Sequence, residues 1–204
     1  PACFLIENVP GLRDLDGGEQ LSAAIKDLRK AGYEVETPTV LNAADYSVPQ
    51  FRDRLFVVGT RTSRSIIFPT PDEMQYGAGS VLLQKQGQAP NTETRSHKLG
   101  SVQRYARLNY GQRDQLGRVD RLSPCRPSKT VIAGGTNGGG RSHLHPEIPR
   151  TLSVRECARL QTFPDDYTFV GPTARQFTQV GNAVPPVLAA QLGLSLARSV
   201  FGVN

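Results

Sequence analysis

The sequence predicts an α/β fold in which part of a Rossmann-like sheet is joined to a small, loop-rich, mainly β region. Two short apolar runs, residues 2–6 and 55–59, have the length and composition of buried strands. Residues 21–28, between these runs, repeat apolar side chains at helical spacing. From about residue 62 to 150 the chain is instead rich in Gly, Pro, Gln, Asn, Thr and Arg, a composition typical of loops and turns.

The first part of the chain is predicted to form a strand, a helix and two more strands. The run 2–6 ends abruptly at Glu7, which suits a buried parallel strand that enters a loop. Gly32 supplies the stop of the helix, and residues 33–35 alternate as a strand does. Because ligands of open α/β sheets lie beyond the carboxyl ends of strands, Glu7 is a candidate functional carboxylate.

The rest of the chain contains one predicted strand and two predicted helices. Residues 130–133, Thr-Val-Ile-Ala, form the strand, and a glycine-rich stretch follows it. A capping box, Ser153-x-x-Glu156, opens a short helix. Pro185 and Pro186 suit the first turn of a last helix, whose apolar stripe must pack against another element.

Composition predicts a soluble, globular, cytoplasmic protein. It is 38% hydrophobic and 21% charged, which is enough to bury a core. No apolar run approaches the roughly 20 residues that span a bilayer, and the first residues lack the basic start of a signal peptide. Three distant cysteines fit neither a disulfide framework nor a zinc site, so we expect a reducing compartment and no metal.

Positive charge is concentrated in one stretch. The whole chain carries a net charge of +6, whereas residues 95–129 alone hold nine basic residues against two acidic ones. Such a stretch is either a solvated surface or a binding surface for a polyanion. The nine residues are Arg95, Lys98, Arg104, Arg107, Arg113, Arg118, Arg121, Arg126 and Lys129.

Four motifs follow one another in a specific order: Glu7-Asn8-Val9, Gln50-x-Arg52-x-Arg54, Arg155-Glu156-Cys157-Ala158-Arg159 and Gly181-Asn182-Ala183-Val184. Together they resemble the motif series of the cytosine-5 DNA methyltransferases over essentially the whole chain. The resemblance implies that the sheet is the C-terminal part of a methyltransferase sheet. It also implies four parts: residues 1–62 from the catalytic α/β domain, 63–150 for target recognition, 151–178 as a hinge with short helices, and 179–204 as a C-terminal helix that returns to the catalytic domain.

The resemblance also implies the chemistry. In this family a cysteine thiolate adds to carbon 6 of cytosine, and carbon 5 then takes a methyl group from S-adenosyl-L-methionine. By position, Glu7 contacts ring nitrogen 3 and the exocyclic amine, and Arg54 contacts the cytosine carbonyl. Arg52 has a supporting electrostatic role. Asn182 and Ala183 are assigned to the cofactor pocket.

Double-stranded DNA is the implied partner. Because the target base must be flipped out of the helix, the protein has to hold a deformed backbone while it contacts the flanking bases. Arginines are suited to phosphates, and glycines let the main chain approach base edges. A flexible surface loop is the alternative explanation of the glycine-rich stretch. The candidate DNA-binding residues are Gln50, Arg107, Arg126, Thr130, Gly138 and Gly139.

Two motifs of the family do not precede Glu7 in this sequence, the Phe-x-Gly-x-Gly cofactor loop and the Pro-Cys-Gln nucleophile loop. Pro124-Cys125-Arg126 resembles the second superficially, but it lies in the lead-in to the predicted recognition strand. Cys3 and Cys157 are expected to be structural. The nucleophile is therefore expected outside this chain.

Two explanations account for the missing motifs. Either a separate subunit carries them, or this chain is the C-terminal fragment of one protein. In both cases we expect an incomplete S-adenosyl-L-methionine site, no activity from this chain alone, and a partner or oligomer that covers the exposed sheet edge. Two alternatives remain: a non-catalytic, sequence-specific DNA-binding module, and an unrelated basic α/β protein with chance motif matches.

Overall fold

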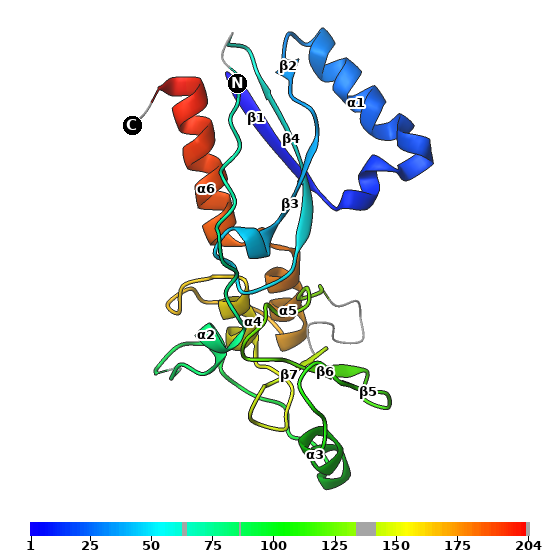
Figure 1. The fold of residues 1–204 in the computed structure, drawn as a ribbon, viewed down its shortest axis with the longest axis vertical. Helices are drawn as coiled ribbons and strands as arrows, with labels where there is room; N and C mark the ends of the chain where they lie inside the picture. The colour runs from blue at the N-terminus through cyan, green and yellow to red at the C-terminus, as the bar shows by residue number, and fades with distance from the viewer. Residues whose placement is uncertain (63–64, 86, 134–141, 203–204) are drawn as a thin grey trace.

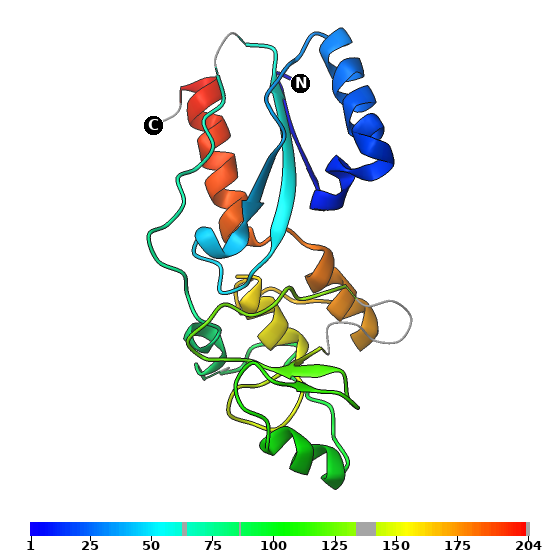
Figure 2. The same cartoon turned by 45° about the vertical axis from the view of Figure 1, so that its right-hand side comes forward.

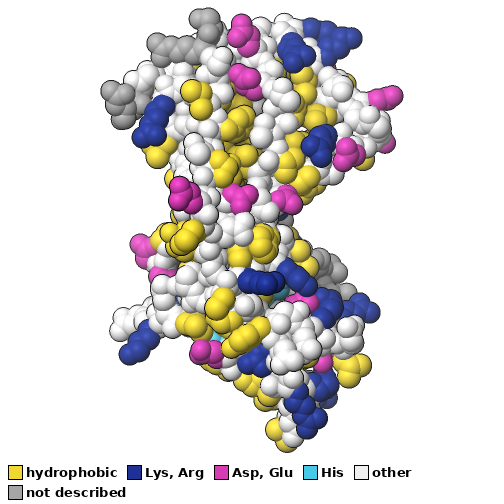
Figure 3. Space-filling model, in the orientation of Figure 1, with side chains coloured by type: hydrophobic (Ala, Val, Ile, Leu, Met, Phe, Trp, Pro, Cys, Tyr) yellow, Lys and Arg dark blue, Asp and Glu magenta, His cyan; other side chains and the backbone are white. Residues whose placement is uncertain are grey.

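The computed structural model describes residues 1–62, 65–85, 87–133 and 142–202. The chain forms two lobes that meet at a narrow waist (Figures 1 and 3). The upper lobe contains a sheet between two helices, α1 (Glu19–Lys30) and α6 (Pro186–Leu196). Figure 2 shows these helices on opposite faces of the sheet, an α/β arrangement of three layers.

The sheet of the upper lobe is built around β4 (Asp53–Thr60). On one side β1 (Cys3–Asn8) pairs with β4 along its whole length. On the other side lie β2 (Glu34–Val35) and β3 (Thr39–Asn42), and all three strands run antiparallel to β4. A strand near residues 2–6 is thus confirmed, but the prediction that it is buried and parallel is wrong for its pairing within this chain.

The difference follows from the place of β1 in the sheet. Among the described strands β1 pairs with β4 alone, so its second edge has no neighbour. Its apolar side chains are consequently not enclosed, and Leu5 and Ile6 are 37% and 42% exposed. Apolar composition indicated burial, but it carried no information about the direction or number of the neighbouring strands.

The two helices of the upper lobe follow the sequence signals. Helix α1 packs Leu21, Ile25 and Leu28 against Leu55 and Val57 of the sheet. Its C-terminal stop at Gly32 is confirmed, since this glycine has a φ of 87°, where a side chain would be strained. Helix α6 has Pro in its first turn, as predicted, and buries Leu188 and Leu192 against the other face. Full burial of one such side chain stabilises the fold by roughly 1.5–3 kcal/mol.

The lower lobe has a second core around α4 (Val154–Leu160) and α5 (Thr173–Asn182), which bury Leu160, Phe177 and Val180 with Phe169. Around it lie α2 (Gly79–Leu82), α3 (Leu99–Ala106), β5 (Arg113–Asp114), β6 (Val119–Arg121) and β7 (His143–Leu144). Because these strands have only two or three residues and two helices share the region, its described part is not mainly β.

Residues 130–133 do not form the predicted strand. The backbone of Val131 is instead hydrogen-bonded to side chains of the Gln50-x-Arg52 segment. The amide oxygen of Gln50 accepts a hydrogen bond from the Val131 N–H at 2.8 Å, and Arg52 donates to the Val131 carbonyl at 3.3 Å. The segment is therefore anchored by side chains instead of a strand ladder. Just before this segment, Ser128 and Gln50 form an isolated parallel β-bridge.

Short helical turns complete the described fold. Three are 3-10 turns at Pro10–Arg13, Leu15–Gly18 and Ala43–Asp45, and a π-helical turn at Ala197–Phe201 follows α6. By length and composition alone, the stretch Thr173–Phe201 is apolar enough to cross a membrane. In the fold it is interrupted at Ala183, whose backbone is extended, and its two helices bury apolar side chains in the two protein cores.

Candidate active site and nucleic-acid interface

The pairing of β1 with β4 brings Glu7, near the end of β1, together with Arg54, near the start of β4. Glu7 lies opposite Phe56, so Arg54 is its diagonal neighbour on the same face of the sheet. Arg54 Nε is 2.7 Å from Glu7 Oε1, and the two side chains are 14% and 25% exposed. The pair therefore presents an acceptor and a permanently charged donor side by side, which suits a planar ligand that has both donors and acceptors.

Arg52 is buried beside this pair and holds three carbonyls. Besides Val131, its guanidinium donates to the carbonyls of Gly181 and Ala183 at 2.8 and 2.9 Å. Burial lowers the pKa of Arg52 to about 10; the nearby charge of Arg54 adds to this effect and Glu7 opposes it. Arg52 thus stays charged at neutral pH and is electrostatically linked to Glu7 and Arg54. Its supporting role in catalysis stays a prediction.

Gln50 and Thr130, two candidate DNA-binding residues, have their polar groups engaged within the chain. The Gln50 side chain is fully buried, donates to the Leu160 carbonyl at 3.2 Å and accepts from Val131. The Thr130 hydroxyl donates to the Phe51 carbonyl at 2.8 Å. In this arrangement both residues join the two lobes, and contact of Gln50 with DNA would require its internal bonds to break.

Asn182 and Ala183, the candidate cofactor residues, follow Gly181 at the end of α5. Asn182 is exposed, and its side-chain amide makes no hydrogen bond with any described residue, which fits the edge of a cofactor pocket. Ala183 is half-buried and its carbonyl is bound by Arg52. The structure therefore connects this turn to Arg52, two residues from Arg54, and the cofactor role of both residues stays a prediction.

The basic stretch divides into two groups. Four of its cations have internal partners: Arg104 pairs with Asp114, Arg113 and Lys129 pair with Asp120, and Arg121 donates to backbone carbonyls. Five others are exposed and make no side-chain hydrogen bond or ion pair with any described residue. These are Arg95, Lys98, Arg107, Arg118 and Arg126. Figure 3 shows basic side chains gathered on the lower lobe, which contains the whole stretch.

Arg107 and Arg126, two of the predicted DNA-binding residues, belong to this unpaired group. Gly138 and Gly139, the other two candidates, lie outside the described residues. The sequence alone did not separate the paired cations from the unpaired ones, because the separation depends on which cations reach the buried Asp114 and Asp120 or nearby backbone carbonyls.

Charged residues of α4 hold the lower lobe together, a role that the motif did not reveal. Arg155 donates to the carbonyls of Pro90, Pro164 and Tyr167. Arg159 pairs with Asp165 and also binds backbone carbonyls of the segment after α2. Only the capping box was visible in the sequence, and it is confirmed: the Ser153 hydroxyl accepts from the Glu156 N–H, and Glu156 accepts from the Ser153 N–H.

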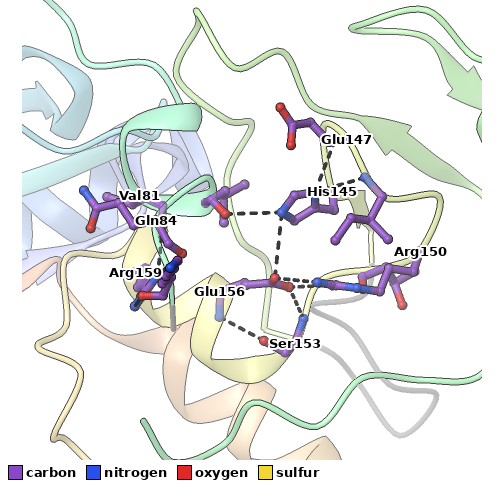
Figure 4. Close-up of polar contacts among 12 residues, drawn as sticks. Val81, Gln84, His145, Glu147, Arg150, Ser153, Glu156 and Arg159 are labelled. Carbon is purple, nitrogen blue, oxygen red and sulfur yellow. Dashed lines mark hydrogen bonds and ion pairs between the residues drawn. The ribbon is translucent and has the colours of Figure 1, made fainter. Parts of the chain in front are cut away.

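Glu156 also binds Arg150 and approaches His145, as Figure 4 shows. Both guanidinium nitrogens of Arg150 donate to the carboxylate at 2.8 Å, and His145 Nε2 is 4.0 Å away. Burial alone would raise the pKa of Glu156, but hydrogen bonds from Arg150 and Ser153 outweigh it and lower the pKa. The buried carboxylate therefore stays ionised, with a partner on each oxygen.

His145 is held in its neutral form. Its Nδ1 accepts hydrogen bonds from the Glu147 and Ile148 N–H groups, both at 3.2 Å, and Nε2 donates to the Leu82 carbonyl. Protonation of Nδ1 would break the first two bonds. Burial lowers the pKa of His145, against the opposing charge of Glu156, and it also lowers the pKa of His143.

We expect the free energy of unfolding to fall as the pH decreases below 6.5. Both histidines have folded-state pKa values below 6.5, so their neutral forms stabilise the fold at higher pH, and this contribution is lost as the pH falls toward the folded-state pKa. Each histidine adds a slope of up to about 1.4 kcal/mol per pH unit. Urea unfolding between about pH 7.5 and 5.5 measures the slope, which His145→Gln should reduce. A flat profile would contradict this assignment.

The three cysteines of this chain lie in different settings. Burial raises the pKa of the Cys157 thiol, which keeps it protonated and unreactive. Cys3 is half-buried beside Val58 and Val200, and Cys125 is exposed in the lower lobe. The described residues also contain no cluster of three or more His, Cys, Asp or Glu side chains suited to a metal ion.

Comparisons with known proteins agree with the motifs. The sequence profile of the C-5 cytosine-specific DNA methylases matches residues 1–198. The Type II methyltransferase M.BbvI of Brevibacillus brevis is 35% identical over 91% of this chain and 55% of its own length. M.MthTI of Methanothermobacter thermautotrophicus is 32% identical over the whole chain and 68% of its own length.

Solved structures share the fold. An Escherichia coli prophage protein described as a DNA modification methyltransferase matches 98% of this chain and 70% of its own, with a TM-score of 0.84 at 24% identity. The Entamoeba histolytica methyltransferase EhMeth matches 97% of this chain with a TM-score of 0.69. The chain spans little more than half the length of the first curated relatives that it matches.

Proposed function

This chain belongs to the C-5 cytosine-specific DNA methylase family, and we propose that it supplies target recognition and one side of the flipped-cytosine pocket in a DNA (cytosine-5-)-methyltransferase. The observation that carries the proposal is the Glu7–Arg54 pair. Two of the four motifs meet there, because Arg54 Nε lies 2.7 Å from Glu7 Oε1 although the two residues are 47 positions apart in the sequence. Both side chains are partly exposed, so the pair is accessible to a ligand.

The proposed chemistry uses the two members of the pair differently. Glu7 holds ring nitrogen 3 and the exocyclic amine. Its carboxyl proton is shared with nitrogen 3 as the thiolate adds to carbon 6, which neutralises the electron pair that the addition pushes into the ring. Arg54 donates to the cytosine carbonyl and orients the carboxylate. The bound S-adenosyl-L-methionine supplies the methyl group, and Asn182 forms one edge of its pocket. The nucleophilic cysteine is supplied from outside this chain.

The lower lobe is proposed to bind duplex DNA through the unpaired cations. Five exposed Lys and Arg side chains on one lobe provide contacts to phosphates that do not depend on sequence. Such contacts also hold the backbone in the deformed shape that a flipped base requires. The bacterial and archaeal relatives named above support a cytoplasmic, prokaryotic enzyme of a restriction-modification system.

The remaining half of the enzyme is proposed to dock on the upper lobe, either as the N-terminal half of the same protein or as a separate subunit. The second edge of β1 is unpaired among the described strands, and Leu5 and Ile6 of β1 and the following Val9 are exposed apolar residues. Leu194 on the outer side of α6 is 57% exposed. An oligomer that covers the same edge is the alternative occupant.

Reconstitution tests this assignment. We expect that the chain alone transfers no methyl groups to duplex DNA and binds S-adenosyl-L-methionine weakly or not at all, because the described residues provide only the Asn182 edge of the pocket. Addition of the half that carries the Phe-x-Gly-x-Gly and Pro-Cys-Gln motifs should restore both. Transfer of labelled methyl groups and calorimetric titration of the cofactor measure these two properties.

Two outcomes would change the conclusion. Micromolar binding of the cofactor to this chain alone would show that the pocket is complete without the missing half. If the reconstituted protein binds DNA but transfers no methyl groups, the chain is a non-catalytic DNA-binding module derived from such an enzyme.

A further inference from the structure

Arg52 joins three segments that are far apart in sequence. From the position just before β4, Arg52 donates to the Val131 carbonyl in the segment before the glycine-rich stretch. It also donates to the Gly181 and Ala183 carbonyls in the turn that carries Asn182. It is 1% exposed, so water does not compete for these bonds. A lysine would keep the charge, but it lacks the planar fork that reaches several carbonyls at once.

The same segments are in direct backbone contact at Gly181. A Cβ atom at this position would lie 2.3 Å from Ala133 N and 2.6 Å from Ala133 Cα. Both are backbone atoms, so any side chain at 181 would push the two segments apart. Gly181 is helical and has an ordinary φ, and glycine is needed here for space rather than for backbone conformation.

Arg52 is also tied to the candidate catalytic pair. It is two residues from Arg54, and the charges of Arg54 and Glu7 both act on its pKa, in opposite directions. Gln50, on the other side, binds Leu160 of α4 and Val131. The short segment 50–52 thus contacts Val131, next to the glycine-rich stretch, and the turn 181–183, and it leads directly into the strand that carries Arg54.

We propose that Arg52 is a positioning residue that, together with Gly181, locks the recognition segment 131–133 and the turn 181–183 against the strand that carries Arg54. This inference rests on the proposed methyltransferase function and gives Arg52 a role that does not involve contact with the cytosine. Formation of the Glu7–Arg54 site then depends on the docking of both segments. DNA contacts on the lower lobe are thereby coupled to the geometry of the reacting groups.

The test compares Arg52→Lys with Arg155→Lys in the full-length methyltransferase that contains this chain. Arg155 is a matched control, because it is equally buried and also donates to three backbone carbonyls, all of them within the lower lobe. We expect Arg52→Lys to lower the single-turnover rate of methyl transfer about a hundredfold at saturating DNA and cofactor, as misplacement by about 1 Å can. The dissociation constant for duplex DNA should change less than about threefold, since phosphate contacts dominate it.

Arg155→Lys should reduce the melting temperature at least as much as Arg52→Lys, with a methyl-transfer rate within about threefold of the unmodified enzyme. Gly181→Ala should reproduce the rate loss of Arg52→Lys. Because both changes disturb one junction, the double variant should be little slower than either single variant.

Three results would overturn the proposal: an unchanged rate in Arg52→Lys, an equal rate loss in Arg155→Lys, or fully multiplicative losses in the double variant. An inactive unmodified enzyme would instead overturn the methyltransferase function itself. The two failures are therefore distinguishable in one set of measurements.

Discussion

Replacement of Glu7 by Gln is expected to slow methyl transfer about a hundredfold in the chain reconstituted with its missing half. Gln keeps the size of the side chain, but it carries no charge and cannot share a carboxyl proton, so ring nitrogen 3 loses its proton partner when the thiolate adds to carbon 6. It also loses the ion pair to Arg54 at 2.7 Å. Loss of one such preorganised contact costs on the order of 3 kcal/mol. Single-turnover methylation of a duplex substrate measures the rate.

DNA affinity distinguishes a chemical role of Glu7 from a general defect. The dissociation constant should change far less than the rate, because contacts of the lower lobe dominate it. Glu34→Gln is a suitable control, since Glu34 is an exposed glutamate in the same sheet, on β2. It should leave the rate unchanged, whereas Arg54→Ala should lower it. A full rate in Glu7→Gln would mean that the carboxylate only caps the end of the strand.

Affinity of the isolated chain for duplex DNA is expected to fall roughly 500-fold between about 50 and 200 mM salt. Five unpaired cations that each displace a condensed counterion give a slope of log K against log salt of about −4.5. The four paired cations contribute less, because three of them form ion pairs with Asp114 or Asp120 and Arg121 is bound to carbonyls. Fluorescence anisotropy with a labelled duplex measures the slope.

Single substitutions locate the surface. Arg107→Ala should reduce the slope by about 1 and weaken binding by a similar factor for every sequence, as loss of one phosphate contact does. Lys26→Ala removes an equally exposed cation from α1 in the upper lobe and should change neither quantity. Affinity that does not vary with salt would show that the basic stretch is not a DNA surface.

Local sequence patterns determined the ends of several helices, because the residues that start or stop a helix lie within a few positions of that end. Gly32 ends α1, Ser153 and Glu156 cap α4, and Pro186 begins α6, because each of these signals acts on the adjacent turn of backbone. The order of the four motifs was likewise a property of the sequence, and it identified the family that the comparisons confirm.

Helix α3 shows how a local signal can be present and still be missed. Its Tyr105 is buried in a small core with Val119 and Leu144, but the polar, basic composition around it indicated a loop. The mainly β prediction for this region failed for the same reason, since loops, short helices and short strands have similar compositions.

Pairing direction, burial and internal bonding were decided only by the tertiary structure. Whether β1 runs parallel or antiparallel depends on β4, about 50 residues later, and no pattern within β1 encodes it. Arg52 and Gln50 have the composition of a charged turn, yet the bonds of Arg52 to Val131, Gly181 and Ala183 span 79, 129 and 131 residues. The sequence determined which residues are chemically able to form such contacts, whereas the packing of segments from both lobes decided which of them are buried as anchors and which remain exposed.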